Sequence, residues 1–428
     1  MIESERGVWR QWIWLLIAFA VCSAVIFGAG FALGQILSPG TRYPVGNTPV
    51  EQQDNFRVFW EAWHIVESDF YARESLDYKN MTYGAIEGML KSLGDPFTTF
   101  VEPTQHRLEQ DAYQGKFGGI GALMGTDEDG RIIISSLLEG APAERAGLRA
   151  GDVVLAVDDT DIAGYSIEEA VILVRGPVGT TVRLRIERPG EPEPLVFEIV
   201  RQEIDLPTVN WRVLEDGIGY IQITMFSDAT PRELRRALES LQGEDASSVV
   251  LDLRGNPGGL VNSAVAVTGE FLRGGLVLRE RTSSDEETRY SAPLDGKAVD
   301  WPLVVLVDGG TASAAEIVAG AIQDYHRALL VGQRTFGKGS VQSIHELSDG
   351  SSVHVTIARW LTPNGHEING QGLTPDVVVE TKAEDLAAGR DLQLEEAISL
   401  LRTQGVSSSS RPFSDWAEFI PVMVGSYG

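Results

Sequence analysis

The sequence has only one cysteine, Cys22, and six histidines among its 428 residues. A single cysteine excludes an intramolecular disulfide and a metal site built from cysteine thiolates. The histidines form no His-Glu-x-x-His motif, which is the helical pattern of zinc peptidases. We therefore predict no metal site and expect ordinary surface or core positions for all six: His64, His106, His326, His345, His354 and His366.

Positive charge is also scarce. Lys and Arg together number 35 against 61 Asp and Glu, so the formal net charge at pH 7 is −26. Such a surface repels phosphate backbones, which argues against nucleic acid as a partner. We interpret the acidity as a contribution to solubility. The chain is 43% hydrophobic and long enough for two or three domains with sizeable cores.

Residues 11–41 contain no Asp, Glu, Lys, Arg or His. Residues 12–37 are almost wholly apolar, which is long enough to span a bilayer as a helix. A cleaved signal peptide is the alternative, but its apolar region would normally be about 7–15 residues long. We favour an uncleaved anchor. Arg6 and Arg10 precede it, so residues 1–40 are predicted to be the cytoplasmic stub and transmembrane helix of a single-pass membrane protein, with the remainder extracytoplasmic.

The next segment, residues 41–112, is predicted to be a linker followed by two helices at about 56–71 and 83–93. Aromatic side chains recur at three- and four-residue spacing in the first helix, and we expect them to be core. Residues 113–203 carry short strand patterns between Gly-rich turns and one short helix capped by Ser166.

Strands and helices then alternate through residues 204–380, which predicts an α/β core. Residues 381–428 are expected to hold a C-terminal helix and a tail. The expected strands of the core lie near 219–223, 249–253, 303–307, 329–331 and 353–360, and the expected helices near 230–241 and 314–325.

Ser313 follows a buried strand and opens a helix, so its hydroxyl is placed at a strand-to-helix turn. A helix N-terminus favours negative charge that develops beside it, as in acyl transfer. On this segment alone, a helix cap at Thr311 or Ser313 is the better interpretation. The surrounding residues do not form the Gly-x-Ser-x-Gly nucleophile motif.

Lys338 is a candidate base for such a serine, because glycines flank it on both sides. A lysine acts as a base only if burial lowers its pKa. If this piece is a strand, Gln342 faces the same way and can hold the amine by a hydrogen bond. Alone, Lys338 is better interpreted as a surface lysine in a Gly-rich loop. The first glycine of a phosphate-binding loop is missing, so that motif is rejected.

A third motif, LDLRGNPGGL at residues 251–260, ends a buried strand with exposed backbone amides. Such amides can form an oxyanion hole. The alternative is an ordinary tight turn, where Pro-Gly is common.

Taken together, these motifs resemble the C-terminal processing peptidases, the Ser–Lys family with an embedded PDZ domain. The resemblance covers roughly residues 56–401. It is carried by YGAIEGMLKSLGDPFTTFVEP, GGIGALM, GAPAERAGLRAGDVVLAVD, LDLRGNPGGL, DGGTASAAEIVAGAIQD, GQRTFGKGSVQ and WLTPNGHEINGQGLTPDVVV, in that order.

The resemblance implies a role for each residue that matches a family motif. Ser313 is then the nucleophile, Lys338 the general base and Gln342 the residue that orients it. Gly258 or Gly259, with the Ala314 amide, forms the oxyanion hole. Asp308 and Thr311 stand where the family more commonly has Asn and Ser, but neither supplies a catalytic atom.

The resemblance also implies a PDZ domain at residues 113–203, placed before a β-β-α spiral core of the crotonase-like kind at 204–380. Its loop Gly118-Gly119-Ile120-Gly121 is expected to bind a substrate's terminal carboxylate while the peptide adds as a strand. The implied function is an endopeptidase that cleaves proteins with free, apolar C-termini and uses no cofactor. These motifs are compatible with either a monomer or an oligomer.

Two other functions are alternatives to a peptidase. A membrane-tethered PDZ scaffold with an inactive peptidase site conflicts with the intact Ser313, Lys338 and Gln342. A crotonase-like acyl-transfer enzyme on a small thioester fits the oxyanion motif, but it explains neither the PDZ segment nor Lys338.

Overall fold

The computed structural model describes residues 50–380, 385 and 389–407. The predicted membrane span lies outside these residues, and none of the helices they form is long and apolar enough to cross a bilayer. The chain divides into two compact units, Met1–Asn80 and Met81–Gly428.

The first unit contains α2 (Val50–Asp69), a short 3-10 helix (Arg73–Ser75) and the start of α3 (Tyr78–Lys91). Both helices confirm the predicted ones. The expectation that the aromatic residues of α2 are core is wrong, because Phe56, Trp60 and Phe70 are about half exposed. The rings of Phe56 and Trp60 instead pack along the helix on the ring of Phe59, and the ring centroids of Trp60 and Trp63 are 5.9 Å apart.

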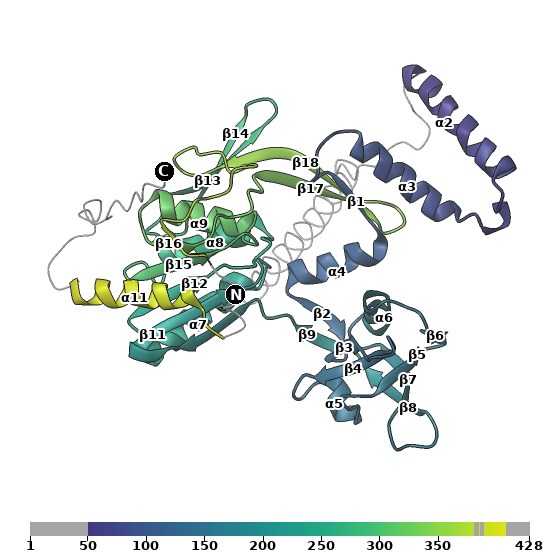
Figure 1. The fold of residues 1–428 in the computed structure, drawn as a ribbon, viewed down its shortest axis with the longest axis horizontal. Coiled ribbons are helices and arrows are strands. Elements are labelled where there is room, and N and C mark those ends of the chain that lie inside the picture. The colour runs from purple at the N-terminus through teal and green to yellow at the C-terminus, as the bar shows by residue number, and fades with distance from the viewer. Residues whose placement is uncertain (1–49, 381–384, 386–388, 408–428) are drawn as a thin grey trace, which may run out of the picture. The chain divides into compact units, whose positions relative to one another are not determined.

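In the second unit, a PDZ-like sheet follows α4 (Pro103–Gln114) and β2, and β2 forms a two-stranded pair with β9, which comes directly after the sheet in the chain. Its strand order is β3-β4-β5-β7-β8, with β6 on β5, and α5 and α6 accompany it (Figure 1). Ser166 caps α6 through a reciprocal pair of hydrogen bonds with Glu169, as the sequence predicted. The bounds are β2 Lys116–Gly119, β3 Ala122–Thr126, β4 Ile132–Leu137, α5 Pro142–Ala146, β5 Val153–Val157, β6 Thr160–Asp161, α6 Ile167–Val174, β7 Thr181–Glu187, β8 Leu195–Val200 and β9 Gln202–Asp205.

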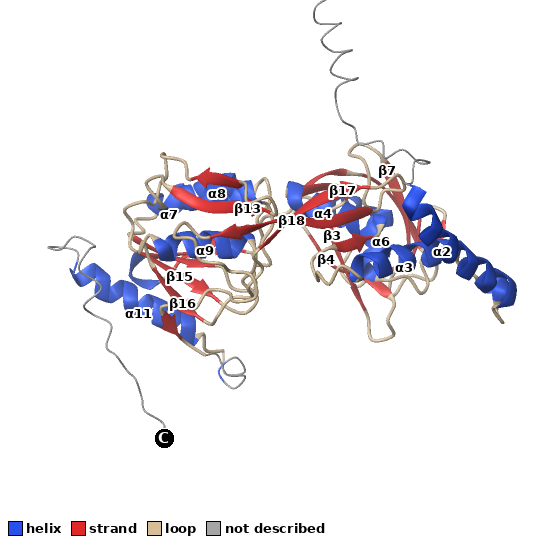
Figure 2. Ribbon diagram, turned by 90° about the horizontal axis from the view of Figure 1, so that it is seen from above, coloured by secondary structure: helices blue, strands red, loops and turns tan. Residues whose placement is uncertain are grey.

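A six-stranded sheet of order β10-β11-β12-β15-β16-β19 forms the centre of the α/β core. All its neighbours run parallel except β10 and β11. Helices α7, α8 and α9 cover one face and α11 the other (Figure 2). The bounds are β10 Val209–Val213, β11 Ile218–Ile223, α7 Thr230–Gly243, β12 Ser248–Asp252, α8 Val261–Phe271, β15 Leu303–Val307, α9 Ala314–Asp324, β16 Leu329–Gly332, β19 Val377–Val378 and α11 Leu392–Ser407, after a 3-10 turn at Glu215–Gly217.

The central strands β12 and β15 are buried along their whole length, because helices cover both faces of a parallel sheet. That is why each appears in the sequence as a continuous apolar run rather than an alternating one. The parallel strands also end at one edge, so the loops after β12 and β15 meet there. Those two loops are the predicted oxyanion motif and the turn that carries Ser313.

A second sheet is antiparallel and was only partly predicted. Its order is β1-β18-β13-β14, and β17 pairs with β18. The predicted strand at 353–360 is confirmed as part of β18, whereas the hairpin β13–β14 carries no clear alternating pattern and was missed. The bounds are β1 Thr99–Val101, β13 Leu276–Thr282, β14 Glu287–Ser291, β17 Ser340–Glu346 and β18 Ser352–Leu361.

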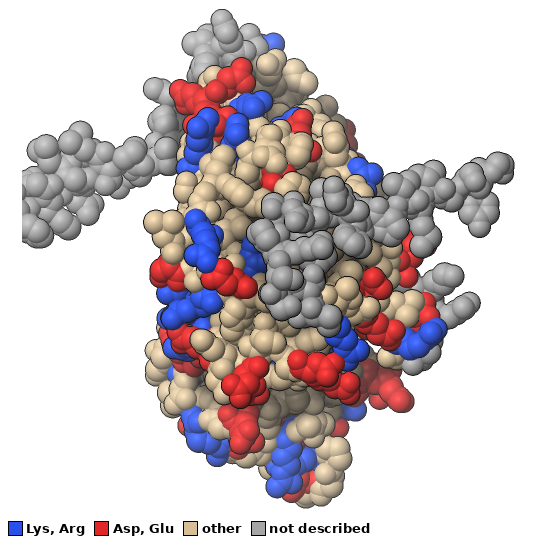
Figure 3. Space-filling view, turned by 90° about the vertical axis from the view of Figure 1, so that its left-hand side faces the viewer, with Lys and Arg blue, Asp and Glu red and all other residues tan. Residues whose placement is uncertain are grey.

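On the face shown in Figure 3, Lys and Arg side chains are interspersed with Asp and Glu and do not gather into one basic patch.

Candidate active site

Ser313 is the N-cap residue of α9 and has backbone angles φ 53° and ψ −117°. A residue with a Cβ rarely adopts a positive φ, and such a conformation costs on the order of 1–3 kcal/mol. The surrounding contacts therefore have to impose it. The strained turn holds the serine at the positive end of the helix dipole. The N-cap interpretation and a nucleophile at this position are thus compatible.

The contact that holds this turn comes from Glu316, whose side chain is fully buried in the first turn of α9. Its Oε2 accepts hydrogen bonds from the Ser313 and Lys338 amides, each at 2.9 Å. Its Oε1 accepts from the Gly337 amide at 2.8 Å and from the Thr335 hydroxyl at 2.6 Å. One carboxylate therefore joins the backbone of the candidate nucleophile to that of the candidate base.

Burial raises the pKa of Glu316, while its four hydrogen-bond donors act in the opposite direction. Glu316 is not among the site residues predicted from the sequence. The available signal was the Ser-x-x-Glu spacing of Ser313 and Glu316, which is that of a helix capping box. That pattern explains the Ser313 contact, but nothing in the local sequence indicates the bonds to Gly337 and Lys338.

Lys338 is half-buried, and burial is the largest influence on its amine, lowering its pKa. The negative charges of Glu109 and Asp95 act weakly in the opposite direction. The amine lies 5.2 Å from the centre of the Phe97 ring. Within the described residues, no hydrogen bond joins it to the Ser313 hydroxyl. The structure thus brings the backbones of Ser313 and Lys338 together, while their side chains are not hydrogen-bonded to each other.

Within the described residues, no hydrogen bond joins Gln342 to Lys338. The condition for both side chains to face the same way is not met, because β17 begins at Ser340 and a bulge follows at Val341–Gln342. A bulge interrupts the alternation of side chains that the prediction assumed. The Gln342 amide instead donates to the Ser340 hydroxyl at 2.7 Å and to the Thr356 hydroxyl at 3.3 Å.

Gly258 lies directly against the nucleophile turn. A Cβ at this position would be 2.7 Å from Ser313 Cβ and 2.9 Å from the Ala314 amide nitrogen. Its φ of 104° also requires glycine. However, its own N–H donates to Asn256 Oδ1 at 2.8 Å. This amide is therefore already engaged, which argues against Gly258 as an oxyanion donor.

Gly259 is the other candidate donor. The Phe226 amide donates to Gly258 O and the Leu260 amide donates to Phe226 O, so Gly259 forms an isolated parallel bridge with Phe226. In that pattern the Gly259 N–H points away from Phe226. Of the two glycines, Gly259 is the one whose amide this geometry leaves for another acceptor.

Asp308 and Thr311, the departures from the commoner family residues, hold the two loops together. Asp308 Oδ1 accepts from the amides of Gly255 and Gly310, each at 2.9 Å. The Thr311 hydroxyl donates to Leu253 O at 2.9 Å. The Ala312 amide also donates to Asn256 O at 2.9 Å. These contacts fix the loop after β12 against the turn after β15.

The predicted carboxylate-binding loop is partly strand. Gly118 and Gly119 belong to β2 and pair with β9, while Ile120 is buried at 2% exposure. Gly121 has φ 72° and leads into β3. Strand β3 is an edge of its sheet and contacts α6 beside it. The edge next to the loop is therefore open to another strand.

This combination of a PDZ-like sheet with an α/β core bearing a serine at a strained strand-to-helix turn is that of a PDZ-containing serine peptidase. Residues 133–188 match the PDZ domain family, and residues 217–379 match Peptidase family S41. The chain belongs to peptidase family S41, among the carboxy-terminal processing proteases, which confirms the resemblance found in the sequence.

Two relatives illustrate the match. A carboxy-terminal-processing protease of Bartonella bacilliformis is 38% identical over 350 residues, covering 81% of this chain and 80% of the relative. A carboxyl-terminal-processing protease of Synechocystis sp. is 36% identical, covering 93% and 97%. Among solved structures, a photosystem II D1 C-terminal processing protease is 33% identical, with a TM-score of 0.44, covering 76% of this chain and 92% of that one.

Proposed function

We propose that this peptidase cleaves protein substrates near their C-termini through an acyl-enzyme on Ser313, with Lys338 as general base. The observation that carries the proposal is the Glu316 carboxylate, which holds the Ser313 and Lys338 amides at 2.9 Å each. Glu316 keeps the backbone of Ser313 and the backbone of Lys338 next to each other while the substrate binds.

In the proposed reaction, the Ser313 oxygen attacks the scissile carbonyl carbon and its proton passes to the neutral Lys338 amine. The negative oxygen that forms is bound by the amides of Ala314 and Gly259. The C–N bond then breaks, and the leaving amine takes the proton from Lys338. A water molecule next attacks the ester, with Lys338 again accepting a proton; the bond between the Ser313 oxygen and the acyl carbon breaks, the Ser313 oxygen takes that proton back from Lys338, and the acyl group leaves as a carboxylic acid.

Lys338 reaches Ser313 in this scheme by rotation of its own side chain. Its backbone is held by the bond to Glu316 and by the Trp360 indole, which donates to Lys338 O at 3.1 Å. The amine, in contrast, lies over the Phe97 ring and makes no hydrogen bond with any residue that the structure describes. A fixed backbone and a movable amine allow the base to engage without rearranging the sheet. Gln342 would orient it only after a similar rotation.

For the PDZ segment, we propose that a substrate C-terminus adds to the free edge of β3, beside α6. The amides of the 118–121 loop would then receive the terminal carboxylate. Leu123 on β3 is 55% exposed and offers apolar surface to the incoming side chains. This arrangement accounts for a preference for apolar tails with a free C-terminus.

A substrate with a free apolar tail is expected to be cleaved roughly tenfold or more faster than the same substrate with an amidated C-terminus. The reason is that amidation removes the charge bound by the loop amides, and hydrogen bonds to charged groups contribute about 1.5–3 kcal/mol. Intact-mass measurement over time, with the Ser313→Ala variant as control, follows both reactions. Equal rates for the two tails would refute the PDZ role alone, whereas cleavage no faster than by Ser313→Ala would refute the peptidase proposal.

We also propose that residues 12–37, which lie outside the described part of the chain, anchor the protein in a membrane with the peptidase extracytoplasmic. The support is the absence of charged residues across 11–41. After high-salt and carbonate washing, the full-length protein is expected to stay in the membrane fraction, and a variant lacking residues 1–40 to become soluble. Recovery of the intact full-length chain in the soluble fraction would overturn this proposal.

A further inference from the structure

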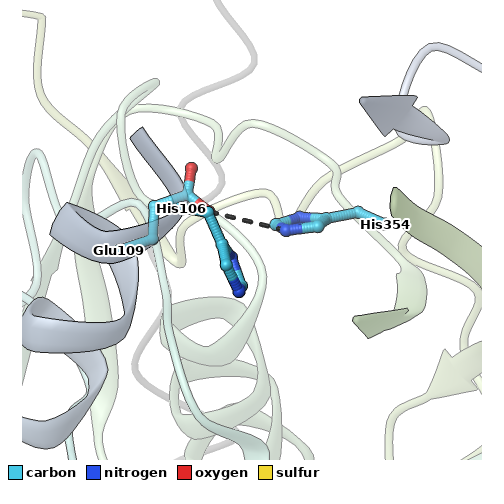
Figure 4. Close-up of side chains that lie close together, drawn as sticks. All are labelled: His106, Glu109 and His354. Atoms are coloured by element: carbon cyan, nitrogen blue, oxygen red, sulfur yellow. Dashed lines mark ion pairs between the residues drawn. The ribbon is translucent and has the colours of Figure 1, made fainter. Parts of the chain in front are cut away.

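Two histidines and one glutamate, far apart in the sequence, lie together between α4 and β18. Pairing of β1 with β18 sets Thr99 opposite His354, and α4 begins directly after β1. His106 and Glu109 are three residues apart on α4, so they share one face of the helix. Figure 4 shows Glu109 on α4 facing His354 on the strand.

The atoms that could bind a ligand are close together. One ligand atom from each of His106, Glu109 and His354 lies within 4.8 Å of the other two. Glu109 Oε2 and His354 Nε2 are 3.5 Å apart. Two zinc ligands at about 2.1 Å and a tetrahedral angle lie roughly 3.4 Å from each other. The Glu109–His354 pair already has that spacing, and a shift of about one ångström by His106 would complete three corners.

The same three atoms make no hydrogen bond, and the contact between Glu109 Oε2 and His354 Nε2 is an ion pair only when His354 is protonated. His106 Nδ1, Glu109 Oε2 and His354 Nε2 are all buried and make no hydrogen bond in the described structure. His106 itself is 4% exposed. A buried polar atom without a hydrogen bond costs about 1–3 kcal/mol, so three such atoms close to one another are a costly arrangement. A ligand between them would satisfy all three at once.

We propose that His106, Glu109 and His354 form a binding site for a divalent transition-metal ion of the zinc class. Two imidazoles and one carboxylate are a donor set that such ions take, with a fourth position left for water. The site uses none of the residues proposed for the peptidase chemistry, although Glu109 and His354 lie within electrostatic reach of Lys338.

The neighbour of His106 supports the same inference. The Gln110 side-chain amide lies 2.9 Å from His106 Nε2. Metal-bound imidazoles usually make a second hydrogen bond through the ring nitrogen that does not bind the metal. A half-turn of the Gln110 amide presents its oxygen to an Nε2–H group, leaving His106 Nδ1 with its lone pair toward Glu109 and His354. Gln110 is thus placed to fix the tautomer that binds.

The test is zinc binding by the full chain carrying Ser313→Ala, purified without a histidine tag and stripped by chelator. Calorimetric titration is expected to give one tight zinc site per chain, and cobalt to give the visible absorption of a tetrahedral complex. Removing one ligand, in His354→Ala or Glu109→Gln, is expected to weaken zinc binding roughly tenfold or more and to abolish the cobalt spectrum.

The matched control is His64→Ala. His64 and Glu67 have the same three-residue spacing on α2 and approach to 2.8 Å, but both lie in the first unit without a third ligand among the described residues. This variant should bind zinc as the parent does. Circular dichroism verifies that each variant is folded. Equal zinc affinity of the parent and a folded His354→Ala or Glu109→Gln variant, or loss of binding in His64→Ala, would overturn the proposal.

Discussion

Replacing Ser313 by alanine is expected to reduce kcat/KM by about 10⁴-fold or more, and replacing Lys338 by alanine to have a comparable effect. Ser313→Ala removes the attacking oxygen, and Lys338→Ala removes the group that accepts its proton. Because either loss disables the same step, the double variant should be hardly slower than either single variant. Cleavage rates of the three purified variants, each shown to be folded, measure this.

The Lys338→Arg variant shows whether Lys338 acts as a base or contributes only its positive charge. A guanidinium remains protonated at all working pH values, so this variant should be as inactive as Lys338→Ala. In the wild type, burial lowers the pKa of Lys338. The neutral, active amine is therefore populated as pH rises through that lowered pKa, and the rate should climb and then level off. Near-normal activity of Lys338→Arg would exclude a neutral lysine base.

The second large effect is expected at Glu316. In Glu316→Gln, one of the two oxygens becomes an N–H₂ group that faces two donors, so two of the four hydrogen bonds are lost. The strained Ser313 turn and the Lys338 backbone are then free to move, and a displacement of about 1 Å can cost 10²-fold in rate. We expect at least that loss in the rate at which an acylating, serine-directed reagent labels Ser313.

Glu316→Gln should also destabilise the fold, so a control of equal burial is needed. Glu270 is 4% exposed and accepts from the Arg235 guanidinium at 2.7 Å and the Lys297 amide at 2.9 Å. Glu270→Gln should lower the melting temperature as well, while the folded fraction keeps its Ser313 labelling rate. If folded Glu316→Gln is labelled at the same rate as Glu270→Gln, Glu316 only stabilises the fold and does not position Ser313.

The sequence by itself determined most of the parallel core. Strands β12 and β15 are apolar along their whole length because both faces of the sheet are covered, and such runs are recognisable without a structure. The order of the motifs identified the family, and the Ser166 cap located α6. The hairpin β13–β14 was not predicted, because half-exposed strands with many charged residues have a weak alternation of apolar and polar residues.

What the tertiary structure alone decided were the contacts between distant segments. Local sequence placed Ser313 at a helix start and Lys338 between glycines, but only the fold brings both amides to Glu316. The Lys338–Gln342 hydrogen bond, expected if both residues lay on one strand, is not made in the described structure, because a strand boundary and a bulge lie between the two residues.

His106 and His354 show the same difference between what the sequence indicates and what the tertiary structure decides. No motif relates His106 to His354, and the sequence indicated ordinary positions for both. They meet because β1 pairs with β18 and carries α4 with it. Sequence patterns report which residues face a core, since burial repeats with the period of a helix or strand. They contain no such signal for which loop ends or faces meet, because that depends on how separate elements pack.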